Sequence, residues 1–206
     1  MDKIFSLNTF DETQRALEAA ADILNNNGIA AIPTDTVYGF AALAADETAV
    51  AKLFRIKERE PKKSIAVLLG DVSQAQLVAH EFPAKALRLA DAYWPGALTI
   101  IIRKKAGLPK NLTSNDLIGL RIPDHDFTRE LIRRTGPLAV TSANISGQPP
   151  ARSIQEFAEE LYPLLDIIID GGACSGGIPS SVINCESDPA VILREGAIPG
   201  KDLLSC

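Results

Sequence analysis

The chain has 206 residues, of which 46% are hydrophobic and 23% are charged, and its formal net charge is −5. These values exclude a disordered chain, a collagen-like repeat and a coiled coil, and the acidic balance excludes a uniformly basic coat for nucleic acid. No apolar run approaches the ~18 residues that a bilayer crossing needs, and the first residues lack the features of a secretory signal. We therefore expect a soluble, cytoplasmic protein with no membrane association.

Residues that bind metals or form disulfides are scarce. There are two histidines, His80 and His125, and three cysteines without a C-x-x-C pair. These counts predict neither a disulfide framework nor a structural zinc site, and they exclude a His-rich metal centre. The chemistry is therefore expected to run without histidine.

Helices and strands are predicted to alternate along the chain. Hydrophobic periodicity and turn residues predict, in order, a helix over 11–27, a strand over 29–33, a helix over 47–59, a strand over 64–69, helices over 73–80 and 83–93, strands over 98–103 and 118–122, a helix over 127–134, a strand over 138–141, a helix over 153–161, and strands over 166–169, 181–183 and 190–194. This alternation predicts one α/β domain over residues 1–206. The last two strands fit a hairpin, so the sheet is expected to be mixed and flanked by helices. The Gly-rich stretch 171–177 is expected to be a mobile loop.

The segment 52–63 is locally basic within an acidic chain. It carries six positive side chains against two glutamates, a balance of 6 − 2 = +4. Lys57 falls on the apolar stripe of the predicted helix, and burying an ammonium costs several kcal/mol unless an anion meets it. Lys57 and Arg59 can therefore flank one phosphate chain, the lysine as a point charge and the arginine as a fork. For Lys62 and Lys63 we favour the simpler interpretation that they complement the helix dipole.

Polar side chains follow the predicted strand over 138–141. Ser142 and Asn144 present a hydroxyl and an amide at the carboxyl end of that strand, where open α/β sheets bind ligands. They can bind a phosphate or a purine edge, but an ordinary turn with a capped helix explains them equally well. The segment 34–36 has the same ambiguity.

Two arginines, Arg121 and Arg194, lie within predicted apolar strands. Each needs a carboxylate or phosphate partner, from the protein or from a ligand, and a structural salt bridge is the favoured interpretation for each taken alone. Together with Lys57 and the hydroxyls, they form a set of cationic and polar groups without an evident nucleophile or metal cage. Such a set indicates phosphoryl or nucleotidyl transfer around a magnesium nucleotide.

Seven short motifs, met in order between about residues 10 and 200, resemble those of the YrdC-like family of L-threonylcarbamoyladenylate synthases. They are Pro33–Gly39 (PTDTVYG), Lys57-x-Arg59-x-Pro61, Tyr93–Thr99 (YWPGALT), Gly119–Pro123 (GLRIP), Thr141–Gly147 (TSANISG), Pro179–Ile183 (PSSVI) and Leu193–Gly196 (LREG). Ser181 stands where the family more often has Thr, and Ala97 where it more often has Pro. The chain resembles the short, single-domain form of the family.

The resemblance implies a twisted, open, mixed sheet with a concave, positively charged cavity. It also implies a nucleotidyltransferase that joins L-threonine, bicarbonate or CO2, and ATP with Mg²⁺ into threonylcarbamoyl-AMP and pyrophosphate. Partner proteins would then transfer the threonylcarbamoyl group to tRNA. By the same resemblance, the catalytic residues are Lys57, Arg59, Ser142 and Asn144; ATP also meets Ser64, Arg152 and Arg194; and L-threonine is held by Thr36, Arg121 and Ser180. No protein-held metal site is implied.

A second function stays open at this point. A YrdC-like protein can bind nucleotide or double-stranded RNA, or act in ribosome maturation, without synthase activity. The basic residues of segment 103–110 would extend an RNA track, although a solvated loop explains them more simply. RNA binding would weaken steeply with salt, whereas threonine-dependent release of pyrophosphate from ATP would need no RNA.

Overall fold

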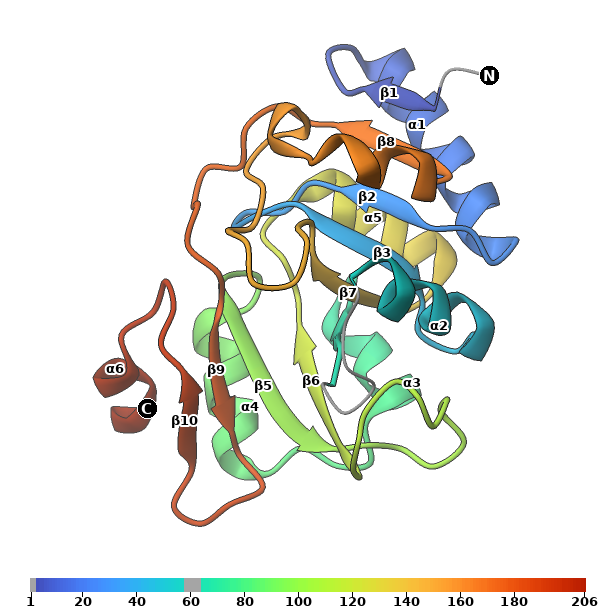
Figure 1. Ribbon diagram of the computed structural model, residues 1–206. Helices are drawn as coiled ribbons and strands as arrows, with labels where there is room; N and C mark the ends of the chain where they lie inside the picture. The colour runs from blue at the N-terminus through green and yellow to red at the C-terminus, as the bar shows by residue number, and fades with distance from the viewer. Residues whose placement is uncertain (1–2, 58–63) are drawn as a thin grey trace.

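The computed structural model describes residues 3–57 and 64–206. Within these residues, ten strands form one mixed sheet in the order β1-β8-β2-β3-β7-β4-β6-β5-β9-β10 (Figure 1). The strands are β1 (Ile4–Ser6), β2 (Ala30–Ile32), β3 (Gly39–Leu43), β4 (Ala66–Leu68), β5 (Leu98–Arg103), β6 (Leu117–Arg121), β7 (Leu138–Ser142), β8 (Ile167–Asp170), β9 (Ser181–Asn184) and β10 (Val191–Arg194). The helices are α1 (Phe10–Asn25), α2 (Glu47–Ile56), α3 (Ala75–Val78), α4 (Ala84–Tyr93), α5 (Asp126–Thr135) and α6 (Gly200–Ser205), with 3₁₀ segments η1 (Val72–Gln74), η2 (Ile154–Glu156) and η3 (Glu159–Leu164).

The mixed α/β sheet confirms the predicted fold class, and β9 and β10 form the expected antiparallel hairpin. The sequence prediction missed β1, β3 and α6. The helix predicted over 153–161 is wrong, because η2 and η3 are separate 3₁₀ segments there. Phe157 interrupts them with φ −70° and ψ 135°. Its ring packs edge-on against Tyr38 and Phe40, at centroid distances of 5.6 and 5.8 Å, so tertiary packing overrides helix propensity.

Side chains alternate between the two faces of the sheet, and helices cover the two faces unequally. One face packs against α2, α3, α4 and the 3₁₀ segments η2 and η3. The opposite face packs against α1 and α5, but only from β1 to β4 in the order of the sheet. Figure 1 shows α1 and α5 at the β1–β8–β2 end and α4 beside β5. Beyond β4 the α1/α5 layer stops, which leaves room on that face of the sheet.

Two glycines, Gly119 on β6 and Gly39 on β3, lie on this face of the sheet. Gly119 pairs with Ile101 across β6 and β5, and a Cβ at Gly119 would lie 3.1 Å from the methyl carbon of Thr99. A Cβ at Gly39 would lie 2.5 Å from Cγ1 of Val140. Larger side chains at these two positions would therefore clash with neighbouring side chains on this face of the sheet.

In the described part of the chain, no helix is long and apolar enough to cross a bilayer.

Candidate active site

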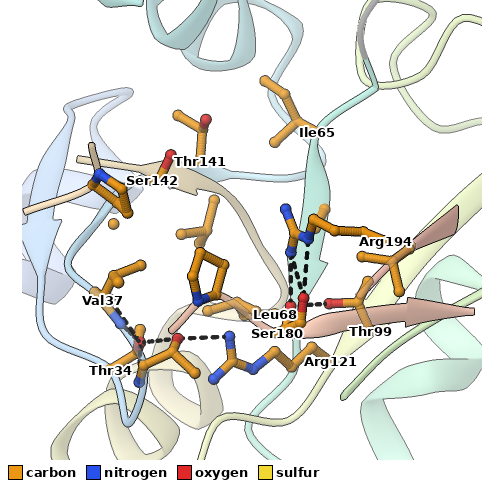
Figure 2. Close-up of a pocket in the computed structure, with 18 of the residues that line it drawn as sticks. Thr34, Val37, Ile65, Leu68, Thr99, Arg121, Thr141, Ser142, Ser180 and Arg194 are labelled. Carbon is orange, nitrogen blue, oxygen red and sulfur yellow. Dashed lines mark hydrogen bonds between the residues drawn. The ribbon is translucent and has the colours of Figure 1, made fainter. Parts of the chain in front are cut away.

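A cavity of ≈ 370 Å³ lies on the open part of the sheet (Figure 2). Residues from seven strands, namely β3, β4, β5, β6, β7, β9 and β10, and from the turns beside them line it. This volume is in the range of small-molecule sites, which is about 300–1,000 Å³. The lining includes seven of the residues singled out in the sequence, namely Thr36, Ser64, Arg121, Ser142, Asn144, Ser180 and Arg194. The structure therefore brings predicted residues from distant parts of the chain into one cavity.

Lys57, at the end of α2, meets the two polar residues at the end of β7. It is 3% exposed, and its Nζ donates to the Ser142 carbonyl at 2.7 Å, to Ser142 Oγ at 3.2 Å and to Asn144 Oδ1 at 2.6 Å. Because Ser142 and Asn144 line the cavity, the Lys57 ammonium lies directly behind its wall. We call these three residues the Lys57 end of the cavity.

Hydrogen-bond directions at the Lys57 end show what Ser142 can do. Ser142 Oγ donates to Asn144 Oδ1 at 2.6 Å and accepts from Lys57, while Asn144 Nδ2 donates to the carbonyls of Ile145 and Gln148 at 2.9 and 2.7 Å. A carbonyl and an amide oxygen accept from Nζ, so the lysine acts as a charged donor and not as a base toward Ser142. The three hydrogens of Lys57 Nζ, the Ser142 hydroxyl hydrogen and both Asn144 amide hydrogens all have protein acceptors, so this end offers an anion the positive charge of the lysine, and it does not activate a serine nucleophile.

Arg121, at the end of β6, has an anchor on each of its guanidinium nitrogens. Nε donates to the Gly96 carbonyl at 2.9 Å, Nη1 donates to Thr36 Oγ1 at 3.0 Å, and Nη2 pairs with Asp35 Oδ1 at 2.5 Å. Burial lowers the pKa of the Arg121 guanidinium, and the Asp35 carboxylate opposes that shift. The structural salt bridge favoured for this arginine is therefore present.

The Thr34–Thr36 turn is stiffened by its own side chains. Thr34 Oγ1 donates to the Val37 carbonyl at 2.7 Å and accepts from the backbone N–H groups of Thr36 and Val37 at 3.1 and 3.2 Å. Its single hydrogen is thus used, so Thr36 is the donor in the 3.0 Å contact between the two hydroxyls. The turn interpretation of this segment holds, and the turn also presents Thr36 to the cavity.

Ser180 and Arg194 meet on the same side of the cavity as Arg121 (Figure 2). Arg194 donates from Nε and Nη2 to the Ser180 carbonyl at 3.0 and 2.7 Å, and from Nη2 to Ser180 Oγ at 3.1 Å. Ser180 Oγ also contacts Thr99 Oγ1 at 2.8 Å. We call the group formed by Thr36, Arg121, Ser180 and Arg194 the Arg121 end of the cavity. The structure thus places Arg194 nearest to Ser180 and not within the Lys57 end.

The remaining three predicted ATP-binding residues are Ser64, Arg152 and Arg59. Ser64 lines the cavity and accepts from the Ser114 backbone N–H at 3.4 Å. Arg152 is exposed, does not line the cavity and packs beside Gly177. Arg59, like Lys62 and Lys63, lies outside the described residues.

Asp35, Tyr38 and Thr99 lie within the quoted motifs, but the sequence analysis assigned none of them a role at the site. The rule that an arginine in an apolar strand needs an anion signalled a partner for Arg121, but only the fold selects Asp35. Thr99 looked like a plain strand residue within an apolar run. Its hydroxyl faces the cavity because strand side chains alternate, and the direction of that alternation depends on register.

Tyr38 fastens the Gly-rich loop 171–177 to the site. Its hydroxyl donates to the Gly172 carbonyl at 2.8 Å and accepts from the Gly171 N–H at 3.0 Å. Further along the loop, the N–H groups of Gly176 and Gly177 donate to the carbonyls of Asp35 and Thr36 at 3.0 and 2.8 Å. The loop, expected to be mobile, is therefore hydrogen-bonded along the back of the turn that carries Thr36.

Comparisons with known proteins show which family and which solved structures this chain resembles. The Sua5/YciO/YrdC family model, described as telomere recombination, matches residues 22–196. The chain is 38% identical over 204 residues to the putative threonylcarbamoyl-AMP synthase of Methanocaldococcus jannaschii, and this alignment covers 99% of the chain and 96% of that relative.

Two solved structures share the fold. Sua5 of Pyrococcus abyssi complexed with L-threonine superposes with a TM-score of 0.93 at 34% identity, covering 98% of this chain and 60% of the other. YciO of E. coli superposes with a TM-score of 0.84 at 27% identity, covering 95% of this chain and 96% of the other. The chain thus spans less than two thirds of the Pyrococcus protein and nearly all of YciO. With the family match and the close archaeal relative, these findings show that the chain belongs to the Sua5/YciO/YrdC family.

Proposed function

We propose that this protein is a threonylcarbamoyl-AMP synthase, which makes threonylcarbamoyl-AMP and pyrophosphate from L-threonine, bicarbonate or CO2, and ATP. The observation that carries the proposal is the cavity itself, which has a buried lysine behind its wall at one end and a buried arginine at the other. Relatives from archaea, bacteria and mammals carry the name threonylcarbamoyl-AMP synthase.

We assign ATP phosphates to the Lys57 end. The Lys57 ammonium lies directly behind Ser142 and Asn144 of the cavity wall, and a fixed positive charge at this place would stabilise the charge that grows on phosphoryl oxygens. Arg59 would add a fork-shaped cation to the same phosphates. Ser64, Arg152 and Arg194 complete the proposed ATP contacts, with Arg194 reaching toward the boundary with the threonine site.

We assign L-threonine to the Arg121 end. Arg121 is a planar cation that suits a carboxylate, while the hydroxyls of Thr36 and Ser180 can bind the polar groups of the amino acid. The Pyrococcus abyssi relative has been solved as a complex with L-threonine, which supports this class of ligand.

The proposed reaction needs no covalent enzyme intermediate. The threonine amine takes up CO2 to give a carbamate and one proton. A carbamate oxygen then attacks the α-phosphorus of ATP, and the bond from the α-phosphorus to the bridging oxygen breaks as pyrophosphate leaves. Lys57 and Arg59 stabilise the charge that grows on the transferring and leaving phosphates, and the two ends of the cavity align the reactants.

Magnesium would enter with ATP as part of the substrate. Mg²⁺ usually binds substrate phosphates and only one or two protein carboxylates. Among the described residues there is no group of three or more His, Cys, Asp or Glu side chains placed to hold a metal ion. We propose that the nucleotide brings the ion, which would neutralise phosphate charge.

The product fits a role in tRNA modification. Threonylcarbamoyl-AMP is a mixed anhydride, so it must be handed to an acceptor, and we propose partner proteins that transfer the group to tRNA in the cytoplasm.

The test is one incubation with ATP, L-threonine, bicarbonate and Mg²⁺, followed by mass analysis of the nucleotide products. We expect threonylcarbamoyl-AMP and pyrophosphate in equal amounts, without added RNA, and none when threonine is omitted. Absence of a threonine-dependent product would contradict the proposal. RNA binding without turnover, with log affinity falling by about 0.7–0.9 per phosphate contact as log salt rises, would favour the RNA-binding alternative instead.

A further inference from the structure

The Asp35 carboxylate lies beside the cavity without lining it. Its Oδ1 accepts from Arg121 Nη2 at 2.5 Å, and the two side chains are 14% and 7% exposed. Removing one partner of such a pair leaves a charge that water reaches poorly. The backbone of Asp35 is itself fixed, because its carbonyl accepts from the Gly176 N–H at 3.0 Å.

Asp35 is the charged member of the three anchors on Arg121. The other two acceptors, the Gly96 carbonyl and Thr36 Oγ1, are neutral. A guanidinium has five N–H donors in a fixed plane, so these three anchors leave one hydrogen on each terminal nitrogen. Those two hydrogens have no acceptor among the three anchors and are the donors that Arg121 can offer to a carboxylate. The direction of these donors depends on all three anchors.

We infer that Asp35 is a positioning residue for L-threonine: it touches no substrate and orients the Arg121 guanidinium toward the substrate carboxylate. This inference rests on the proposed function, because it concerns the amino-acid site of that reaction. Asp35 lies within the motif Pro33–Gly39, but the motif assigned it no role and it does not line the cavity.

The sign of the effect distinguishes orientation from simple electrostatics. Asp35 carries the same charge as the carboxylate of threonine, so charge alone predicts that its removal strengthens threonine binding. Orientation predicts the opposite, because an untethered guanidinium must be fixed at the moment of binding, and a small misplacement of a binding group is costly. The two accounts therefore differ in the direction of the change in KM.

The experiment compares the wild-type protein with Asp35→Ala and Asp35→Asn in the synthase assay. We expect Asp35→Ala to raise the KM for L-threonine by about tenfold or more, with kcat and the KM for ATP nearly unchanged, because only ground-state positioning of one substrate is lost. Asp35→Asn keeps the size and one acceptor oxygen, so its KM should fall between the other two. Glu130→Gln, which removes a carboxylate from a surface ion pair on α5, is the matched control and should match the wild type.

A KM for threonine that is unchanged or lowered in both Asp35 variants would overturn the inference. If Asp35→Ala does not fold, Asp35→Asn decides by the same criterion. A double variant tests the route: with Arg121→Ala already present, Asp35→Ala should no longer raise the KM, and a further rise would overturn a role through Arg121. A wild-type protein without threonine-dependent turnover would instead refute the proposed function, so the two failures are distinguishable.

Discussion

The two ends of the cavity present cations in different ways. At the Lys57 end, a point charge donates to neutral oxygens of Ser142 and Asn144, which lie close together in sequence at the end of β7. At the Arg121 end, a planar cation is held by groups from distant segments, including the Asp35 carboxylate. A point charge suits the shifting charge of a phosphoryl group, whereas a fixed fork suits a carboxylate of constant shape. Under the proposed function, charge stabilisation would therefore lie at the Lys57 end and substrate orientation at the Arg121 end.

The largest expected effect is at the Lys57 end. Lys57→Ala should lower kcat by roughly 10²–10³, the usual cost of losing one donor that stabilises transition-state charge. Threonine binding, measured separately, should change little because Lys57 lies at the other end. Lys52→Ala, from the same helix, is the control, because within residues 3–57 and 64–206 the hydrogen bond of Lys52 Nζ goes to the Asn27 carbonyl and Lys52 does not line the cavity. A wild-type rate in Lys57→Ala would end the assignment.

A smaller effect is expected at the Arg121 end. Arg121→Lys keeps the charge but cannot reach Gly96, Thr36 and Asp35 at once. Since a hydrogen bond to a charged group contributes about 1.5–3 kcal/mol, the KM for threonine should rise by roughly ten- to a hundredfold while the KM for ATP stays the same. Steady-state kinetics with each substrate varied in turn measures both values. Equal rises in the KM for threonine and the KM for ATP would show that the two ends are not separate. Arg133→Lys, at an exposed position of α5, serves as the control.

The smallest effect concerns the support behind the Arg121 end. Tyr38→Phe removes the hydroxyl that bonds Gly171 and Gly172, which are exposed enough for water to replace it. We therefore expect a loss of only about 1 kcal/mol in the free energy of unfolding, measured by urea denaturation. An unchanged denaturation midpoint would mean that this hydroxyl does not stabilise the loop.

Much of the fold could be predicted from hydrophobic pattern, and the exceptions have physical causes. β1 has three residues, and β3 (GFAAL) is a short apolar run whose spacing does not distinguish a strand from a helix, so neither gives a clear strand signal. The segment 153–161 has helical spacing, but burial of Phe157 against Tyr38 and Phe40 determines its path. Local pattern cannot report such distant packing.

The site residues likewise divide into those that local sequence pattern could predict and those that only the fold brings together. Burial of Lys57 followed from its place on an apolar stripe, and its meeting with Ser142 and Asn144 agrees with their position after a strand. Asp35 could not be selected, because pairing it with Arg121 requires a turn and a strand that are separated by 86 positions in sequence. Spacing identifies the chemistry of single motifs, whereas the fold decides which motifs share an end of the cavity.

The most direct test is a crystal structure with L-threonine and a non-hydrolysable ATP analogue. We expect the threonine carboxylate within hydrogen-bond distance of Arg121 and Thr36, and the triphosphate beside Lys57 and Ser142. A triphosphate bound at Arg121, or a threonine carboxylate bound at Lys57, would contradict the division of the cavity.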